Sequence, residues 1–311
     1  MLTVALAAAA IDYAALRTVD RQLAAIAHRL VTANAPICPD LAPTPGVVLH
    51  AADQYPPEER EAAAKALGLP TPVAVEAVVP GSAAAQAGVG EGDGLVAVNG
   101  RAVRVEARAE ASSASRDGAR AMIGDSPAAE PLRLTLRRDG VDRRVTVAPS
   151  PGCRSTFELL LGPKLTAQAD GATVQIGVAW FARVPDEEVA VLVAHELAHN
   201  ILRHRARLDA AGVSRGVFAE VGRNGRLIRR TEDEADRLSV HLLRNAGYDP
   251  QVAVRFWTGA GDKADGGLFR SRTHAGAKSR ARLIGAEIAS IEGQARGTGA
   301  ALVTTRNDPL E

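Results

Sequence analysis

Apolar residues near the beginning of the chain recur in steps of three or four, which is the spacing of one face of an α-helix. They are Leu16, Val19, Leu23, Ile26 and Leu30. The pattern predicts a helix over residues 1–34, and the prolines of residues 34–47 predict an extended linker after it. The apolar run of residues 2–11 is also typical of a signal-peptide core, although no basic residue precedes it. A signal segment and the first turns of a helix therefore remain two open interpretations.

Short apolar segments alternate with glycine turns between residues 73 and 147. The dipeptides Asn99-Gly100 and Asp139-Gly140 are typical of tight hairpins. A short helix is predicted before these segments, with glutamates in its early turns. The predicted helix covers residues 56–67, and predicted strands include 74–79, 132–137 and 141–147.

The last part of the chain has long helical patterns. A strand over residues 172–178 precedes a long helix predicted over residues 186–210. The glycine- and arginine-rich segment 212–230 predicts a mobile loop. Further helices are predicted over residues 232–245, 251–258 and 278–292.

These patterns divide the 311 residues into two domains with two flanking segments, as the length suggests. We expect a fold of the α+β class, with a small β-rich domain and a mostly helical domain. The expected parts are an N-terminal helix and linker at 1–56, the β-rich domain at 57–149, the helical domain at 150–296 and a disordered tail at 297–311.

Composition removes several classes of function. Hydrophobic residues make up 46% of the chain, enough for a packed core. The 37 basic and 36 acidic residues leave a net charge of +1, so the chain lacks the basic footprint of a nucleic-acid-binding protein. No apolar run reaches the roughly 18 residues that span a bilayer. The two cysteines, Cys38 and Cys153, form no C-x-x-C motif, but a single bridge between them fits an oxidising compartment.

A metal-binding motif lies within the helix predicted from residue 186. His195 and His199 are four residues apart and share a helix face, so both imidazoles can reach one ion. Glu196 follows His195 directly and can stand beside the ion as a general base. His204 lies five residues beyond His199, off that face, and is predicted to be a cation at the end of the helix.

A catalytic zinc site typically has a third protein ligand, and the acidic segment of residues 231–236 supplies candidates. Glu232 is the predicted ligand, and Asp236, one turn later, is predicted to hold a ligating imidazole from behind. Thr231 and Glu234 are predicted to form a capping box that begins the helix. Glu234 is the rival third ligand, and its capping role favours Glu232. The predicted cofactor is one zinc ion per chain.

Together these motifs resemble the BepA-type and HtpX-type zinc metallopeptidases, family M-forty-eight of the gluzincin clan. The HExxH motif and the acidic segment about thirty residues later carry the resemblance. Residues 166–171, 240–250 and 273–280 resemble further family segments, with Thr166 in place of the usual Asn and Ala275 in place of the usual Pro. The resemblance covers residues 150–293 and implies a mostly helical domain of the gluzincin type.

The resemblance implies roles residue by residue. His195, His199 and Glu232 are implied as zinc ligands, Glu196 as the general base and Asp236 as the support behind the ligands. His274 is implied as an additional zinc contact in a latched resting state or as a donor to the oxyanion. The implied reaction is peptide-bond hydrolysis, and the strand at 173–178 is a candidate edge for an extended substrate.

The β-rich part resembles a PDZ domain of the kind associated with bacterial proteases. The match rests on residues 78–88, on Gly92-Asp93 and on Val98-Asn99-Gly100. Leu67-Gly68-Leu69 resembles the glycine loop that holds a chain-end carboxylate. The resemblance implies binding of substrate or partner chain ends, and a module used only for packing or docking is the alternative.

The sequence therefore predicts a zinc-dependent endopeptidase that acts on protein substrates in envelope quality control. We expect it in the periplasm or on a membrane facing the periplasm, with the N-terminal segment as a candidate attachment. No nucleic-acid partner is expected. The alternatives are a PDZ-based binding or chaperone protein that is not primarily proteolytic, and a zinc hydrolase with a non-peptide substrate.

Overall fold

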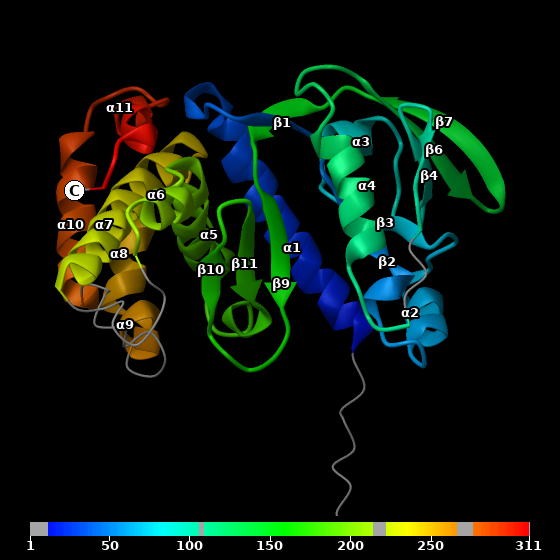
Figure 1. Cartoon of the computed structure of the whole chain (residues 1–311), viewed down its shortest axis with the longest axis horizontal. Helices are drawn as coiled ribbons and strands as arrows, with labels where there is room; N and C mark the ends of the chain where they lie inside the picture. The colour runs from blue at the N-terminus through cyan, green and yellow to red at the C-terminus, as the bar shows by residue number, and fades with distance from the viewer. Residues whose placement is uncertain (1–11, 106–108, 214–221, 266–275, 311) are drawn as a thin grey trace, which may run out of the picture.

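The computed structural model describes residues 12–105, 109–213, 222–265 and 276–310. The protein combines α and β structure in two groups of elements on either side of one long helix, α1 (Tyr13–Ala33) (Figure 1). We call residues 47–147 the β-rich unit and residues 156–290 the helical unit. Within the described ranges, no helix combines the length and the apolar character needed to cross a membrane.

The β-rich unit is built on an antiparallel sheet with the strand order β2-β3-β4-β6-β7, in which β5 also pairs with β4. Asn99 and Asp139 have positive φ angles of 50° and 51°, which confirms a tight turn at each predicted hairpin dipeptide. The strands are β2 (Val47–Ala51), β3 (Val73–Val78), β4 (Gly94–Val98), β5 (Arg101–Ala102), β6 (Leu132–Arg138) and β7 (Val141–Val147).

Helices α2 (Arg60–Leu67), α3 (Ala83–Gln86) and α4 (Ala114–Gly124) complete the β-rich unit. Helix α4 lies in a polar stretch whose pattern predicts no element. Its Ala119 and Ile123, one turn apart, are buried in the core of this unit. Burial of this narrow apolar face therefore stabilises α4.

The predicted carboxylate-binding loop at Leu67-Gly68-Leu69 is wrong. Gly68 has a φ of 62° and ends helix α2, and the Leu69 N–H donates to the Ala64 carbonyl as in other glycine-terminated helices. The segment leads into β3, a strand paired on both sides. It is therefore not beside a free sheet edge that could accept a peptide.

The helical unit begins with a three-stranded sheet in the order β10-β11-β9 (Figure 1). Strand β9 (Thr156–Leu160) is parallel to β11 (Thr173–Gly177), and β10 (Ala167–Ala169) is antiparallel to β11. The helices are α5 (Asp186–Ile201), α6 (His204–Ala210), α7 (Gly222–Asn245), α8 (Gln251–Thr258), α9 (Ala260–Asp265) and α10 (Ala277–Ser290).

Two helix boundaries in this unit differ from the prediction. The helix predicted over 186–210 is broken at Arg203, which has a φ of 55°, so that α5 and α6 are separate. Helix α7 begins at Gly222, inside the predicted loop 212–230, because Leu227 is buried against Val213 and Leu310. Residues 214–221 lie outside the described part of the chain. Thr231 is therefore inside a helix and forms no capping box; its hydroxyl donates to the Ile228 carbonyl.

The C-terminal segment predicted to be disordered is ordered over its described residues, 297–310. It contains α11 (Ala300–Thr304), and both Val303 and Leu310 are buried. Arg306 pairs with Asp40, far away in the sequence. Apolar contacts and this ion pair hold the tail, and neither is visible in its local composition. Short 3₁₀ helices in the chain are Ala35–Ile37, Ala52–Gln54, Val178–Trp180 and Thr305–Asn307.

Helix α1 joins the two units. The predicted N-terminal helix is confirmed from Tyr13 onward, where the Asp12 carboxylate accepts the Ala14 and Ala15 N–H groups; residues 1–11 lie outside the described range. Most of its buried residues belong to the core of the helical unit, and two of its three arginines form ion pairs with the β-rich unit. The third, Arg29, donates to the Ala246 carbonyl of the helical unit at 2.6 Å. The α1 residues in that core are Leu23, Ile26, Leu30 and Val31, and the ion pairs are Arg17–Glu76 and Arg21–Glu91.

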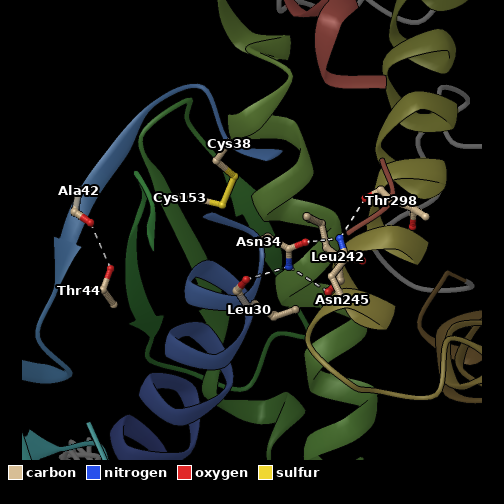
Figure 2. Close-up of a disulfide and its surroundings, with 9 residues drawn as sticks. All are labelled: Leu30, Asn34, Cys38, Ala42, Thr44, Cys153, Leu242, Asn245 and Thr298. Carbon is tan, nitrogen blue, oxygen red and sulfur yellow. Dashed lines mark hydrogen bonds between the residues drawn. A yellow bond between two sulfur atoms is a disulfide. The ribbon is translucent and has the colours of Figure 1, made fainter. Parts of the chain in front are cut away.

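The predicted linker is partly a strand. Strand β1 (Leu41–Thr44) pairs antiparallel with β8 (Ser150–Cys153), and a disulfide joins Cys38 to Cys153 at this place (Figure 2). Asn34, at the end of α1, donates to the Leu242 carbonyl of α7 at 3.0 Å and accepts from Asn245 at 2.9 Å (Figure 2). The end of α1 is thus tied to both β8 and α7.

A cavity of about 640 Å³ lies between the two units. Its lining residues come from α1 and β1, from β2 and α4 of the β-rich unit, and from β8 and β9. Strand β2 is the outer strand of its sheet, so one of its edges faces away from β3. An outer strand is the kind of edge to which an extended chain can add by backbone pairing.

Candidate metal centre

Helix α5 is the central element of the helical unit. Its first turn carries Asp186, Glu187 and Glu188, whose charges suit the positive end of the helix dipole. Every residue from Val189 to Ala198 is buried, because the sheet strands, α7 and α8 contact this helix on different sides. A helix packed on so many sides gives the motif of residues 195–199 a rigid support.

The two motif histidines converge with Glu232 of α7. The Nε2 atoms of His195 and His199 are 3.1 Å apart. The Glu232 carboxylate lies 3.3 Å from His195 Nε2 and 3.5 Å from His199 Nε2. His195 and Glu232 are buried and His199 is partly buried, and their ligand atoms lie within 4.8 Å of one another. The structure therefore brings together the three predicted ligands, from two helices that are distant in sequence.

The separations between these atoms fit a small divalent cation. Bonds of about 2.0–2.1 Å in a tetrahedron place neighbouring ligand atoms roughly 3.3 Å apart. The two Nε2 atoms are 3.1 Å apart, and Glu232 places Oε2 at 3.3 Å from His195 Nε2 and Oε1 at 3.5 Å from His199 Nε2, so each of these contacts is close to that value. Two imidazole nitrogens and one carboxylate oxygen are also the donor set of known catalytic zinc sites. The residues present therefore fit a zinc ion, with one coordination position left for water or substrate.

Asp236 lies behind the His195 ring, and Arg280 contacts both Asp236 and the ring itself, with its Nη2 atom 3.2 Å from Nδ1 and 3.3 Å from Nε2 of His195. The Asp236 Oδ1 atom lies 3.0 Å from His195 Nδ1, on the side of the ring away from Glu232. Arg280 donates to both Asp236 oxygens, with its Nε at 2.7 Å from Oδ2, and its guanidinium lies 3.6 Å above the Trp257 ring. The predicted role of Asp236 thus has the geometry it needs, and Arg280 neutralises the buried carboxylate.

Burial and charge act in opposite directions on these groups. Burial and Arg280 lower the pKa of His195, but hydrogen bonds with Asp236 and Glu232 outweigh both and raise it to about 9. Burial raises the pKa of Asp236, whereas Arg280 and His195 together lower it to about 2. Asp236 is therefore an anion at neutral pH and a strong hydrogen-bond acceptor for His195.

The structure contradicts the prediction for His204. This residue begins α6 and is 1% exposed, and its Nδ1 atom lies 2.9 Å from Nδ1 of His199. Its other nitrogen, Nε2, lies 3.2 Å from Glu234 Oε2. Burial lowers the pKa of His204, so it is not a solvated cation at a helix end. The break at Arg203 turns His204 back toward His199, which the spacing along a continuous helix would not allow.

Of the two residues implied to take part in catalysis, the structure describes Glu196 but not His274. Glu196 lies on α5 between the two ligand histidines and is 9% exposed. Burial lowers the pKa of Arg280, but the charges of Asp236, Glu232 and Glu196 outweigh burial and raise it, which places Glu196 in the same charge network. His274 lies outside the described residues, so its implied role stays a prediction.

The predicted substrate edge at 173–178 is wrong. Strand β11 is the middle strand of its sheet and is paired on both sides, with β9 and with β10. Strand β10 is an outer strand that contacts α5. The outer edge beside α5 therefore belongs to β10, within residues 166–171. The same residues form one of the segments that resemble the peptidase family.

A second group of candidate ligands is formed by Asp20, His50 and Glu76. His50 Nε2 lies 3.3 Å from Asp20, and Arg17 Nε donates to Glu76 at 2.9 Å. Because the Arg17 guanidinium already neutralises Glu76, this group is best explained as an ion-pair network between α1 and the β-rich unit.

Comparison with known proteins does not place the chain in a family. No protein-family model matches the chain, and no curated protein matches it at a significant level. A function for this protein therefore rests on the geometry of the residues around His195 and His199.

Proposed function

We propose that this protein is a zinc-dependent endopeptidase that hydrolyses peptide bonds in protein substrates. The observation that carries the proposal is the convergence of His195, His199 and Glu232, with Glu196 on the same helix as the two histidines. A structural zinc site needs no carboxylate beyond its ligands, whereas hydrolysis needs a base next to the metal.

Each group of residues in the site has a separate role in the proposed hydrolysis. Zinc bound by the three ligands would supply a Lewis acid that polarises the scissile carbonyl and makes water more acidic. Glu196 accepts the proton of the attacking water and returns it to the leaving amine. Asp236 holds His195 in the orientation that presents Nε2 to the metal. The dense packing around α5 keeps these groups in place.

The proposal includes the resemblances found in the sequence. The helical unit corresponds to a gluzincin-type peptidase domain and the β-rich unit to a PDZ-like domain that docks substrates or partners. The disulfide supports an oxidising compartment, in agreement with a protein that faces the periplasm. Envelope protein quality control is the function class that suits these features together.

The first test is zinc analysis combined with cleavage of casein. We expect about one zinc per chain, cleavage that a chelator abolishes, and recovery when zinc is added back. The Glu196→Gln variant should keep its zinc and lose at least about a hundredfold in kcat, because the base is missing. Absence of bound zinc, or full cleavage by Glu196→Gln, would contradict the proposal.

A second candidate function is peptide binding without proteolysis as the main role. The cavity between the units, with the outer edge of β2 and helix α4 in its wall, favours this candidate. The Glu196→Gln variant also separates the two functions. If that variant replaces the wild type in the cell, binding is the main function; if it does not, proteolysis is.

A further inference from the structure

His204 and Glu234 form a second support behind the metal ligands, separate from Asp236. His204 is buried, and its two ring nitrogens contact His199 and Glu234. Glu234 also accepts from Arg207 at 2.6 Å and from Arg230 at 3.0 Å. The Arg207 guanidinium donates in addition to the Asp308 carbonyl, so the ordered C-terminal segment helps to hold this group.

The proton positions in this chain follow from hydrogen-bond chemistry. An ionised carboxylate only accepts, so His204 Nε2, at 3.2 Å from Glu234, carries a proton. A neutral imidazole has a single N–H, which leaves a lone pair on His204 Nδ1. That lone pair accepts the Nδ1–H of His199 across the 2.9 Å separation. The lone pair of His199 is then on Nε2, the atom that faces His195 and Glu232.

We infer that His204 and Glu234 are positioning residues for the metal ligand His199: Glu234 fixes the tautomer of His204, and His204 fixes the tautomer and ring orientation of His199. The two ligating histidines are thus held in different ways, His195 by an anion and His199 through a neutral imidazole. This inference rests on the proposed zinc site, because the tautomer and orientation of His199 matter only if its Nε2 atom binds the ion. Partners behind metal ligands typically contribute ten- to a hundredfold to metal affinity.

Zinc affinity measured with a competing chelator, in the absence of any substrate, tests this inference. His204→Phe keeps the ring volume and removes the acceptor, and we expect it to weaken zinc binding about ten- to a hundredfold. His204→Asn offers Oδ1 near the position of Nδ1, and we expect an affinity within about threefold of wild type. The matched control is His241→Phe, because His241 is another buried histidine, which contacts Glu287 and Thr298 instead of a ligand.

Nitrogen-15 NMR of the histidine rings gives a readout independent of affinity. We expect the Nε2–H tautomer for His204 and the Nδ1–H tautomer for His199 in the zinc-loaded protein. The opposite tautomer at His204, or equal zinc affinity of His204→Phe and wild type, would overturn the inference and leave the proposed function intact. A wild-type chain that binds no zinc would overturn both. Circular dichroism of each variant checks that it is folded before its zinc affinity is compared with that of the wild type.

Discussion

Arg280 shows how one residue can hold a buried charge in the helical unit. It is 5% exposed, forms two hydrogen bonds with Asp236 and covers the Trp257 ring. The planar guanidinium suits both contacts, which a lysine ammonium could not make together. Because Asp236 is almost fully buried, its negative charge depends on this partner and on His195.

Replacing Arg280 should therefore destabilise the fold through Asp236. We expect Arg280→Met to lower the free energy of unfolding by about 3 kcal/mol, because it leaves a buried carboxylate with a weaker counter-charge. Adding Asp236→Asn should recover part of this loss, since it removes the charge that Arg280 compensated. Urea unfolding of the chelator-treated proteins measures both values. A double variant less stable than the single one would contradict this explanation.

At the scale of elements, α1 is the part of the chain on which the arrangement of the others depends. Its apolar side is buried in the core of the helical unit, and its C-terminal end is tied to α7 through Asn34 (Figure 2). The disulfide between Cys38 and Cys153 joins the segment after α1 to β8, across a sequence separation of 115 residues. A covalent link over so long a loop restricts the unfolded chain strongly.

Removal of the disulfide should therefore cost stability. We expect Cys38→Ala/Cys153→Ala to lower the free energy of unfolding by about 2–4 kcal/mol. Alanine suits this site because both cysteines are buried and need no polar partner. Urea unfolding with and without reductant checks the effect, since reductant should destabilise the wild type and leave the double variant unchanged. Equal sensitivity of both proteins to reductant would argue against the pairing.

At the scale of the whole molecule, Glu158 is a direct connection between the two units. It lies on β9 and accepts from Arg116 and Arg120 of α4, and from Gln175 of β11. Burial and the nearby Arg116 lower the pKa of Arg120 to about 10. The Glu158 carboxylate acts in the opposite direction, because it compensates the two positive charges of Arg116 and Arg120. The contact lies beside the cavity that separates the units.

Glu158→Gln should loosen the contact between the units while each remains folded. We expect amide hydrogen exchange in α4 and β9 to become about 5- to 30-fold faster, which corresponds to roughly 1–2 kcal/mol. Asp117→Asn is the matched control, because Asp117 also pairs with Arg116 but belongs to α4 itself. A control variant that accelerates exchange in β9 as much as Glu158→Gln does would show that Glu158 is not the connection.

The sequence by itself was enough for features that depend on neighbours along the chain. The hairpins at Asn99-Gly100 and Asp139-Gly140, helix α8 and the shared face of His195 and His199 follow from local spacing and turn chemistry. The choice of Glu232 also agrees with the geometry. Part of its sequence argument was wrong, however, because Thr231 lies inside α7 and forms no capping box.

Only the tertiary structure decided which distant residues meet. The order of the C-terminal segment, the free edge of β10, the Arg280–Asp236 pair and the contact of His204 with His199 all depend on elements far apart in sequence. Periodicity describes one element at a time and treats α5 and α6 as a single helix. The turn at Arg203 is stabilised by burial of His204 and its bond with Glu234 of α7, and such contacts between elements leave no signal in the local pattern.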